Sequence, residues 1–153
     1  MIKDLENALG YRFRNITLLQ NALTHSSYAN ERWHDSLMSN ERLVFLGDSI
    51  LGMVVAEHLD RNFPDRPEGE LTRMRAYMVC EQSLAAVANQ LGLGTHLMLG
   101  HGEEAGGGRA RPSILADAVE SVIAASFLDG GMDAAAGIIQ RFVFDQCAGD
   151  ETP

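Results

Sequence analysis

The sequence predicts an all-α fold, and three observations support this prediction. Apolar residues recur at helical spacing along nearly the whole chain, and no segment alternates apolar and polar residues as a half-buried strand does. Glycines and prolines fall between the periodic segments, where they end one helix and start the next. A length of 153 residues with 46% apolar residues suits one domain that folds without disulfides or a structural metal. We therefore expect a compact multi-helix bundle with no significant sheet.

Breaks in the sequence define six predicted helices. Gly10 ends the first helix, the rigid turn Pro64–Pro67 follows the third, and the fourth is expected to break near Cys80. The polar stretch over residues 24–38 predicts a loop, and five glycines between residues 100 and 112 predict a second, mobile loop. The predicted helices cover residues 2–9, 16–23, 40–62, 68–91, 112–129 and 133–147. Together they are expected to form one domain over residues 1–147, and residues 148–153 are expected to be a polar tail or the start of a linker.

The cysteines and the apolar stretches indicate the cellular compartment. Cys80 and Cys147 stand alone without a CxxC spacing, which argues against a disulfide scaffold or a zinc knuckle and suits a reducing cytosol. The first residues lack the basic and apolar regions of a secretory signal. Acidic residues interrupt the long apolar stretches, so no membrane span is expected. The predicted location is therefore cytoplasmic, with no membrane partner.

The net charge of −9 excludes a simple nucleic-acid-binding module, because such modules are basic. The 12 Lys and Arg residues are outnumbered by 21 Asp and Glu residues, so the average field of the chain repels a polyanion. A protein of this charge that acts on nucleic acid needs cations at the site, local clusters of arginine, or a further domain that supplies affinity.

The predicted helix over residues 40–62 carries acids on a largely apolar surface. Its apolar residues cover nearly all sides, which is typical of a buried central helix. Glu41 and Asp48 nevertheless lie on the same stripe as Val44, one turn to either side of it. Buried carboxylates are unfavourable unless they are paired or bind a metal. Gly47 disfavours a helix by about 1 kcal/mol relative to alanine, which predicts close approach by another segment at this point.

A second acidic pair, Asp117 and Glu120, lies one turn apart in the predicted helix over residues 112–129. If the two helices face each other, their carboxylate oxygens form a site that suits Mg²⁺ or Mn²⁺ rather than Zn²⁺. Such a site activates water and offsets charge on phosphate oxygens. The spacing alone leaves a second interpretation open, in which these carboxylates are solvated or salt-bridged.

The run from Asn40 to Ser49, Asn-Glu-Arg-Leu-Val-Phe-Leu-Gly-Asp-Ser, closely resembles the signature of the ribonuclease III family. Three further segments match the family in the same order. They are Leu-Thr-His-Ser-Ser-Tyr at residues 23–28, Glu-Gly-Glu-Leu-Thr-Arg-Met-Arg-Ala at residues 68–76, and Ser-Ile-Leu-Ala-Asp-Ala-Val-Glu at residues 113–120. The resemblance covers roughly residues 3–145, which is essentially the whole catalytic domain of the family.

The resemblance implies an all-helical catalytic domain that forms a symmetric homodimer and cleaves double-stranded RNA. The implied cofactor is Mg²⁺, with Mn²⁺ able to substitute, and the products carry 5′-phosphate and 3′-hydroxyl ends. Asp48, Asp117 and Glu120 match family carboxylates at the metal site, and Asp48 and Glu120 match the two with the direct catalytic role. The implied biological role is RNA processing, including that of ribosomal RNA.

Other residues are expected to bind RNA or the partner subunit. Through the resemblance, Glu41 and Glu68 match acids that line the RNA-binding valley, and Phe45 matches an aromatic residue that enters a pocket of the partner. Arg109 and Arg111 lie in the glycine-rich segment, where a flexible basic loop would contact the RNA backbone. The glycines are not followed by Gly-Lys-Ser/Thr, so no nucleotide cofactor is expected. His25 is interpreted as a structural residue near a helix end.

Val44 departs from the family, which has a metal-ligating glutamate at this position. Valine offers no oxygen, so three carboxylates of four remain, and Mg²⁺ should bind more weakly. We expect impaired cleavage with folding and dimerisation retained. Two alternatives to an active endoribonuclease are a catalytically inactive homodimer that binds RNA or partners without cleavage, and a helical metal-dependent hydrolase of small phosphates. The chain stops at Pro153 without the double-stranded-RNA-binding domain of complete bacterial enzymes, so an isolated catalytic domain is expected.

Overall fold

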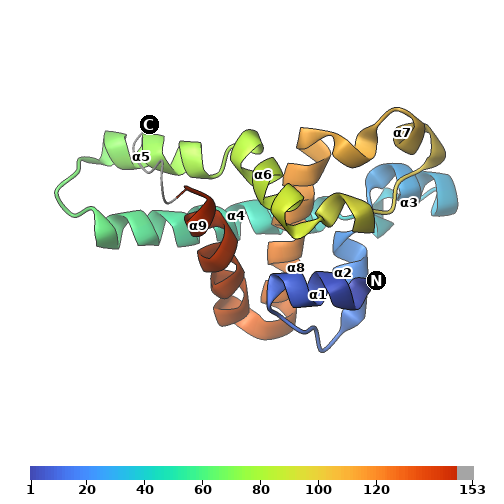
Figure 1. Ribbon diagram of the computed structural model, residues 1–153, viewed down its shortest axis with the longest axis horizontal. Coiled ribbons are helices and arrows are strands. Elements are labelled where there is room, and N and C mark those ends of the chain that lie inside the picture. Colours follow the sequence, from blue (N-terminus) through green and yellow to red (C-terminus); the bar gives the residue numbers. More distant parts are fainter. Residues whose placement is uncertain (148–153) are drawn as a thin grey trace.

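Helix α8 (Pro112–Ile138) lies at the centre of the fold, and α2, α4 and α6 pack against it (Figure 1). The computed structural model describes residues 1–147, so the predicted tail over residues 148–153 lies outside the described residues. Within the described part there is no strand, and an isolated bridge pairs Thr24 with Met98, which confirms the all-α prediction. The remaining elements are α1 (Ile2–Leu9), α2 (Ile16–Ala22), α3 (Ser26–Trp33), η1 (Ser36–Met38), α4 (Glu41–Asn62), α5 (Glu68–Met78), α6 (Glu81–Leu91), η2 (Leu93–His96), α7 (His101–Ala105), η3 (Gly108–Ala110), η4 (Ile139–Phe144) and α9 (Asp145–Cys147).

The central position of α8 follows from its sequence. Its first half is apolar on nearly all sides, and Leu115 and Ile123 are almost completely buried. Gly131, with φ of 79°, turns the chain between the two helices predicted over residues 112–129 and 133–147. By length and mean hydropathy alone the stretch Pro112–Phe144 would suit a membrane. Its packing against α2, α4 and α6, and the turn at Gly131, account for the apolar composition within the fold.

Helix α4 packs across α8 with one side only. Leu43 and Ile50 are buried, whereas Phe45 is 79% exposed and Met53 is 55% exposed. The expectation of a helix buried on all sides is therefore wrong for the single chain, because α8 holds the central place and α4 leaves an apolar face open. Beyond the crossing, α4 forms a hairpin with α5 that extends from one end of the molecule (Figure 1). The break predicted near Cys80 separates α5 from α6.

Two segments predicted as loops contain helices. The stretch after α2 forms α3, because the His25 side chain accepts a hydrogen bond from the Ser27 N–H and so caps the helix. The glycine-rich stretch forms α7 and η3, where two ion pairs restrain the freedom of the glycine backbone. Those pairs are Glu104–Arg109 and Glu103–Arg111. A loop without secondary structure is therefore the wrong prediction for both segments.

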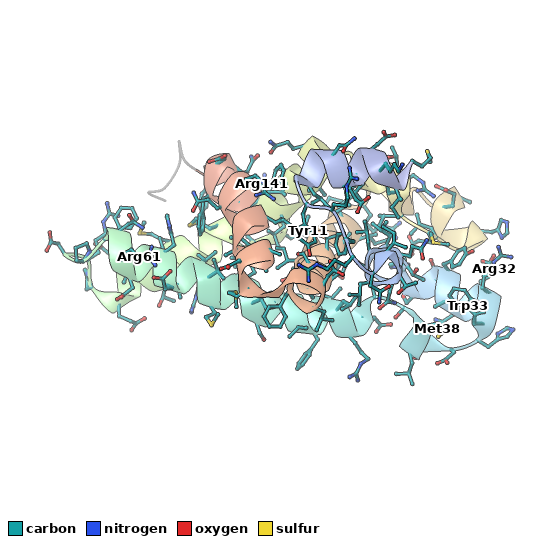
Figure 2. All side chains as sticks on the ribbon, turned by 90° about the horizontal axis from the view of Figure 1, so that it is seen from below. Tyr11, Arg32, Trp33, Met38, Arg61 and Arg141 are labelled. Atoms are coloured by element: carbon teal, nitrogen blue, oxygen red, sulfur yellow. The ribbon has the colours of Figure 1, made fainter. Side chains whose placement is uncertain are left out.

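Asp129, just before the Gly131 turn, holds the segment between α1 and α2 against α8. Its carboxylate accepts hydrogen bonds from the Tyr11 hydroxyl (2.6 Å) and from the backbone N–H groups of Arg14 (2.9 Å) and Asn15 (2.8 Å). Figure 2 labels Tyr11 in this region. Burial opposes ionisation, but these hydrogen bonds outweigh it and lower the pKa of Asp129. Burial and the bond to Asp129 raise the pKa of Tyr11 to about 12.

Replacing Asp129 with alanine should destabilise the fold by about 2–3 kcal/mol near neutral pH, because three donors lose a charged acceptor. The folded-state pKa of Asp129 lies below its unfolded value. The stabilisation is therefore complete above the unfolded pKa and disappears as the pH falls through the folded-state pKa. Urea unfolding of both proteins at neutral and acidic pH measures the difference. The control is Asp133→Ala, since Asp133 is exposed and its carboxylate makes no hydrogen bond among residues 1–147. Equal losses in the two variants would contradict the prediction.

Candidate functional site

The two acidic pairs predicted from the sequence meet where α4 crosses α8. A Cβ atom added to Gly47 would lie 1.9 Å from the backbone carbonyl oxygen of Glu120, far inside contact distance. Glycine is therefore required at this crossing, and the predicted close approach at Gly47 is confirmed. Because Asp48 follows Gly47 in α4, the crossing brings the Asp48 carboxylate to Glu120.

The side chains of Asp48 and Glu120 form a hydrogen bond. Burial contributes most to a raised pKa of Glu120, and the hydrogen bond and charge of Asp48 and the charge of Asp117 add to it, giving about 8. The Glu120 carboxyl therefore favours its protonated form more strongly than a free glutamate does. Two carboxyl groups this close do not both ionise unless a positive charge compensates them.

A cavity of about 450 Å³ opens at the starts of α3 and α4 and the first turns of α8, and Asp48 and Glu120 are not among its lining residues. Asp117, Glu41 and Val44 are among the residues that line it, and Val44 contributes only methyl groups. Burial raises the pKa of Asp117; the nearby His25 acts in the opposite direction, and the charges of Glu81 and Glu41 raise the pKa again. The carboxyl groups of the site therefore cannot all ionise together without a free-energy cost.

The donor chemistry of this site suits a hard divalent cation. Asp48, Asp117 and Glu120 offer carboxylate oxygens, the ligands that Mg²⁺ prefers, and a cation would offset the charge that raises the pKa values of Asp117 and Glu120. Within residues 1–147, however, no three Asp, Glu, His or Cys side chains are arranged so that they could hold a metal ion. The three residues have the chemistry of Mg²⁺ ligands and come together at the helix crossing, but within residues 1–147 their spacing is not that of a metal site. Their role as ligands stays a prediction.

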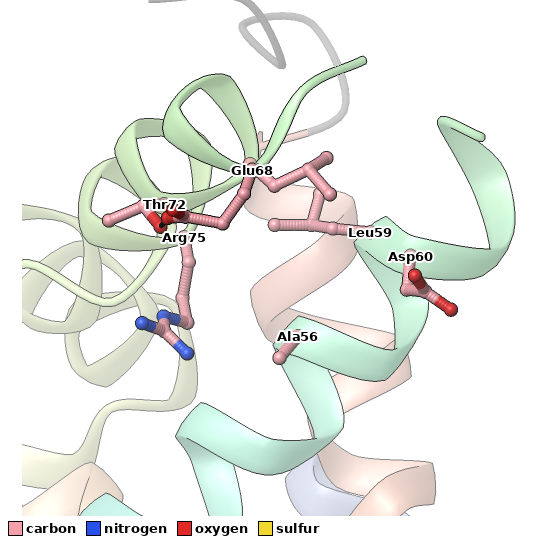
Figure 3. A pocket seen from close by; sticks show the side chains of 7 residues that line it. Ala56, Leu59, Asp60, Glu68, Thr72 and Arg75 are labelled. Carbon is pink, nitrogen blue, oxygen red and sulfur yellow. Dashed lines mark hydrogen bonds between the residues drawn. The ribbon is translucent and has the colours of Figure 1, made fainter. Parts of the chain in front are cut away.

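Glu68 lies away from these acids within one copy of the chain. It begins α5 and lines a separate cavity of about 240 Å³ between α5 and α4, together with Arg75 (Figure 3). The hydroxyl of Thr72, one turn later, donates a hydrogen bond to its carboxylate. About 20 Å of helix separate Asp48 from the end of α4, where the hairpin begins. The fold therefore does not bring Glu68 to Asp48 and Glu120.

Arg109 and Arg111 both make contacts within the chain. The Arg109 guanidinium pairs with Glu104 and donates hydrogen bonds of 2.8 Å to two backbone carbonyl groups in the segment 94–97. Arg111 pairs with Glu103. Both side chains stabilise the segment that leads into α8, and their predicted contact with RNA stays a prediction.

Phe45 borders an apolar groove on the open face of α4. The groove has a volume of about 540 Å³ and is also lined by Leu43, Leu46 and Leu128. Leu128, in α8, is 51% exposed. A large exposed aromatic side chain beside such a groove is typical of a protein–protein contact.

Two residues that the fold brings to the site are not predicted by the sequence pattern. Glu81 begins α6, and its charge acts on Asp117. No local signal relates α6 to α8, so Glu81 could not be found from its own segment. His25 does cap α3, as its structural interpretation implies, but it also lines the cavity beside Asp117.

Comparisons with known proteins agree with this fold. A family profile described as Ribonuclease-III-like matches residues 15–147. Ribonuclease 3 of Symbiobacterium thermophilum is 57% identical over 136 residues, which make up 89% of this chain and 55% of that protein. Ribonuclease 3 of Oleidesulfovibrio alaskensis is 52% identical over 144 residues, which make up 94% of this chain and 62% of that protein. The chain therefore spans little more than half the length of these curated relatives.

Solved structures show the same architecture. A nuclease domain of ribonuclease III from Campylobacter jejuni, described as having structural flexibility in a region involved in dimer formation, matches with a TM-score of 0.89 and 40% identity over 95% of this chain and 98% of that one. A second structure of that nuclease domain matches with a TM-score of 0.86 and 41% identity, over 94% of each chain. The fold is thus the all-helical fold of these nuclease domains. The chain belongs to the ribonuclease III family.

Proposed function

We propose that this chain is the nuclease domain of an Mg²⁺-dependent endoribonuclease that hydrolyses double-stranded RNA. The observation that carries the proposal is the α4–α8 crossing, which joins Asp48 to Glu120 with Asp117 close by, at the positions of the family carboxylates. Family membership supports the reaction class, and the oxygen-only donor set supports Mg²⁺, with Mn²⁺ as a substitute. The proposed products carry 5′-phosphate and 3′-hydroxyl ends.

In this proposal Asp48, Asp117 and Glu120 hold the cation, and Asp48 and Glu120 act directly in hydrolysis. When bound, the cation supplies a Lewis acid that offsets charge on phosphate oxygens and lowers the pKa of water. The chain itself fixes the carboxylates on two helices whose close contact at Gly47 prevents sliding. Glu120 gives up the proton that it shares with Asp48 once a positive charge compensates both groups.

The proposed partners are double-stranded RNA and a second copy of the chain. Glu41, Glu68, Arg109 and Arg111 are assigned to the RNA-binding surface, where the two arginines would exchange their carboxylate partners for phosphates. Phe45 and its groove are assigned to the homodimer contact, which would cover the open face of α4. The dimer formation described for the Campylobacter jejuni domain supports this assignment. The proposed setting is RNA processing in the cytoplasm, including that of ribosomal RNA.

Val44 is proposed to impair this activity, because it places methyl groups in the cavity where the family has a ligand. The same residue favours a second candidate function, a homodimer that binds duplex RNA without cutting it. Incubation with a long RNA duplex and Mg²⁺ or Mn²⁺ separates the two. Short products with 5′-phosphate ends support the nuclease, and a retarded but intact duplex on a native gel supports the binding protein. If the chain neither binds nor cleaves the duplex, both candidate functions are overturned. Turnover of nucleotides in that case would favour a small-phosphate hydrolase.

Replacing Glu120 with glutamine should abolish cleavage and yet stabilise the metal-free fold by about 1–2 kcal/mol near neutral pH. Glutamine keeps the size of the side chain and a donor for Asp48 but removes the ionisation that burial opposes. The folded-state pKa of Glu120, about 8, lies above its unfolded value, so the native chain loses stability as the pH rises toward 8. With a chelator present, the melting temperature of the native chain should fall as the pH rises toward 8. The melting temperature of the variant should change less over the same pH range. Glu70→Gln on α5 is the control, and parallel pH profiles for the native chain and Glu120→Gln would contradict the prediction.

A further inference from the structure

The cavity beside the acids contains a hydrogen-bond donor that the proposed reaction leaves unused. His25 is the N-cap of α3, and its Nδ1 accepts a hydrogen bond from the Ser27 N–H (3.1 Å) and lies 2.8 Å from Ser27 Oγ. A ring nitrogen that accepts from a backbone N–H carries no proton, so the neutral imidazole has its proton on Nε2. The cap thus fixes both the tautomer and the direction of the ring.

The Nε2 atom of His25 makes no hydrogen bond to the described residues, and the side chain lines the cavity of about 450 Å³. Among the other lining residues, Asp117 and Glu41 are acidic, and Val44 has no polar side-chain atom. The Asn40 amide donates one of its two N–H groups to the backbone carbonyl of Ala22 (3.0 Å). His25 and the neighbouring Ser26 also offer side-chain donors to a ligand in this cavity.

An RNA strand in this cavity presents phosphate oxygens with a full negative charge. Carboxylates on α4 and α8 repel these oxygens, and a cation held by the carboxylates attracts them from that side only. An imidazole N–H can donate a hydrogen bond to an anionic oxygen, which an ionised carboxylate cannot do. Arginine or lysine at the same place would pair with those acids and compete with the cation.

We propose that His25 is a phosphate-binding positioning residue, whose Nε2–H donates a hydrogen bond to a non-bridging phosphate oxygen of the RNA strand that enters the cavity beside Asp117. The role rests on the proposed function and adds a donor from α3 to the acids of α4 and α8. In this role His25 positions the RNA backbone relative to the acids and takes no part in breaking the phosphodiester bond.

The substitution His25→Asn separates this role from helix capping. Asparagine is a preferred N-cap whose side-chain oxygen accepts from the Ser27 N–H, so α3 should remain capped, but it is too short to replace Nε2–H. The expected result is an unchanged melting temperature with about tenfold weaker binding of a short RNA duplex, as for the loss of one hydrogen bond to a charged group. The matched control is His34→Asn at the other end of α3. His34 has φ of 52°, which asparagine tolerates, and it does not line the cavity, so this variant should bind as the native chain does.

A set of duplexes with one neutral methylphosphonate at successive positions tests the contact itself. The native chain should lose about tenfold in affinity at the contacted phosphate, and His25→Asn should lose nothing further there while remaining sensitive at other positions. Fully additive effects at every position would overturn the proposal, as would native-like binding by His25→Asn. A native chain that binds no RNA duplex would overturn the proposed function and the role of His25 together. A native chain that binds, with a variant that binds equally well, would disprove the role of His25 alone.

Discussion

Replacing Val44 with glutamate should increase Mg²⁺-dependent cleavage of duplex RNA by at least about 100-fold, since the loss of even an indirect metal partner lowers affinity or activity by 10–100-fold. Val44 lines the cavity that contains Asp117 and lies one turn before Asp48 in α4. A carboxylate there adds the fourth oxygen donor that the family carries. Single-turnover cleavage of a labelled duplex, measured over a range of Mg²⁺ concentrations, should show both a faster rate and saturation at lower Mg²⁺.

The matched control for this variant is Val44→Gln, which has the size of glutamate without its charge. It should leave cleavage near the level of the native chain. In chelator, Val44→Glu should be less stable than Val44→Gln, because a further negative charge joins Asp117 and Glu41. An equal rate for Val44→Glu and the native chain would mean that the ligand set differs from the one proposed.

Replacing Gly47 with alanine should destabilise the fold by about 3 kcal/mol or more, at the upper end of the range for overpacked cores. The added Cβ would lie 1.9 Å from the Glu120 carbonyl oxygen and 2.6 Å from its carbonyl carbon. Both are backbone atoms, so relief requires α4 and α8 to separate rather than one side chain to turn. Urea unfolding of the native and variant chains measures the loss directly.

Gly52→Ala provides the control for this prediction on the same helix. No atom outside the helix lies within 4 Å of a Cβ at Gly52. Alanine there should leave the fold unchanged or stabilise it by up to about 1 kcal/mol, because alanine favours helix over glycine. Similar changes in stability at the two glycines would show that the crossing at Gly47 is not the tight contact described here.

The helices that could be predicted from the sequence are those with strong local signals. Gly10 adopts a left-handed conformation with φ of 73° and ends α1 as expected. The missed helix α3 has a weak signal, because it lies at the edge of the fold and buries only Ala29 among its eight residues. Its cap is a histidine, which is not among the usual N-cap residues. Local reasoning therefore succeeds where amphipathic faces and glycine breaks are marked, and fails where tertiary contacts and an unusual cap define the helix.

The candidate site was predictable in part for the same reason. The spacing of Asp117 and Glu120 is a local property of one helix, and the glycine before Asp48 signals a close contact. Which segment makes that contact is set by the packing of α4 on α8, which no local pattern contains. The apolar sides of α4 likewise cannot distinguish a face buried in its own core from the face around Phe45 that is open in the single chain. The position of Glu68 at the start of α5, away from the other acids, also depends on how the hairpin of α4 and α5 folds.

Val44 and Gly47 lie three residues apart on one helix, yet the structure gives them opposite tolerance to change. The side chain at residue 44 reaches an open space, so its chemistry can vary while the architecture stays intact. Residue 47 has no such latitude, because a single methyl group there would separate the two central helices. Under the role proposed for residue 44, a lineage of this fold can lose or regain cleavage by exchanging one side chain, whereas the packing of α4 on α8 is preserved by Gly47, which takes no part in the proposed reaction.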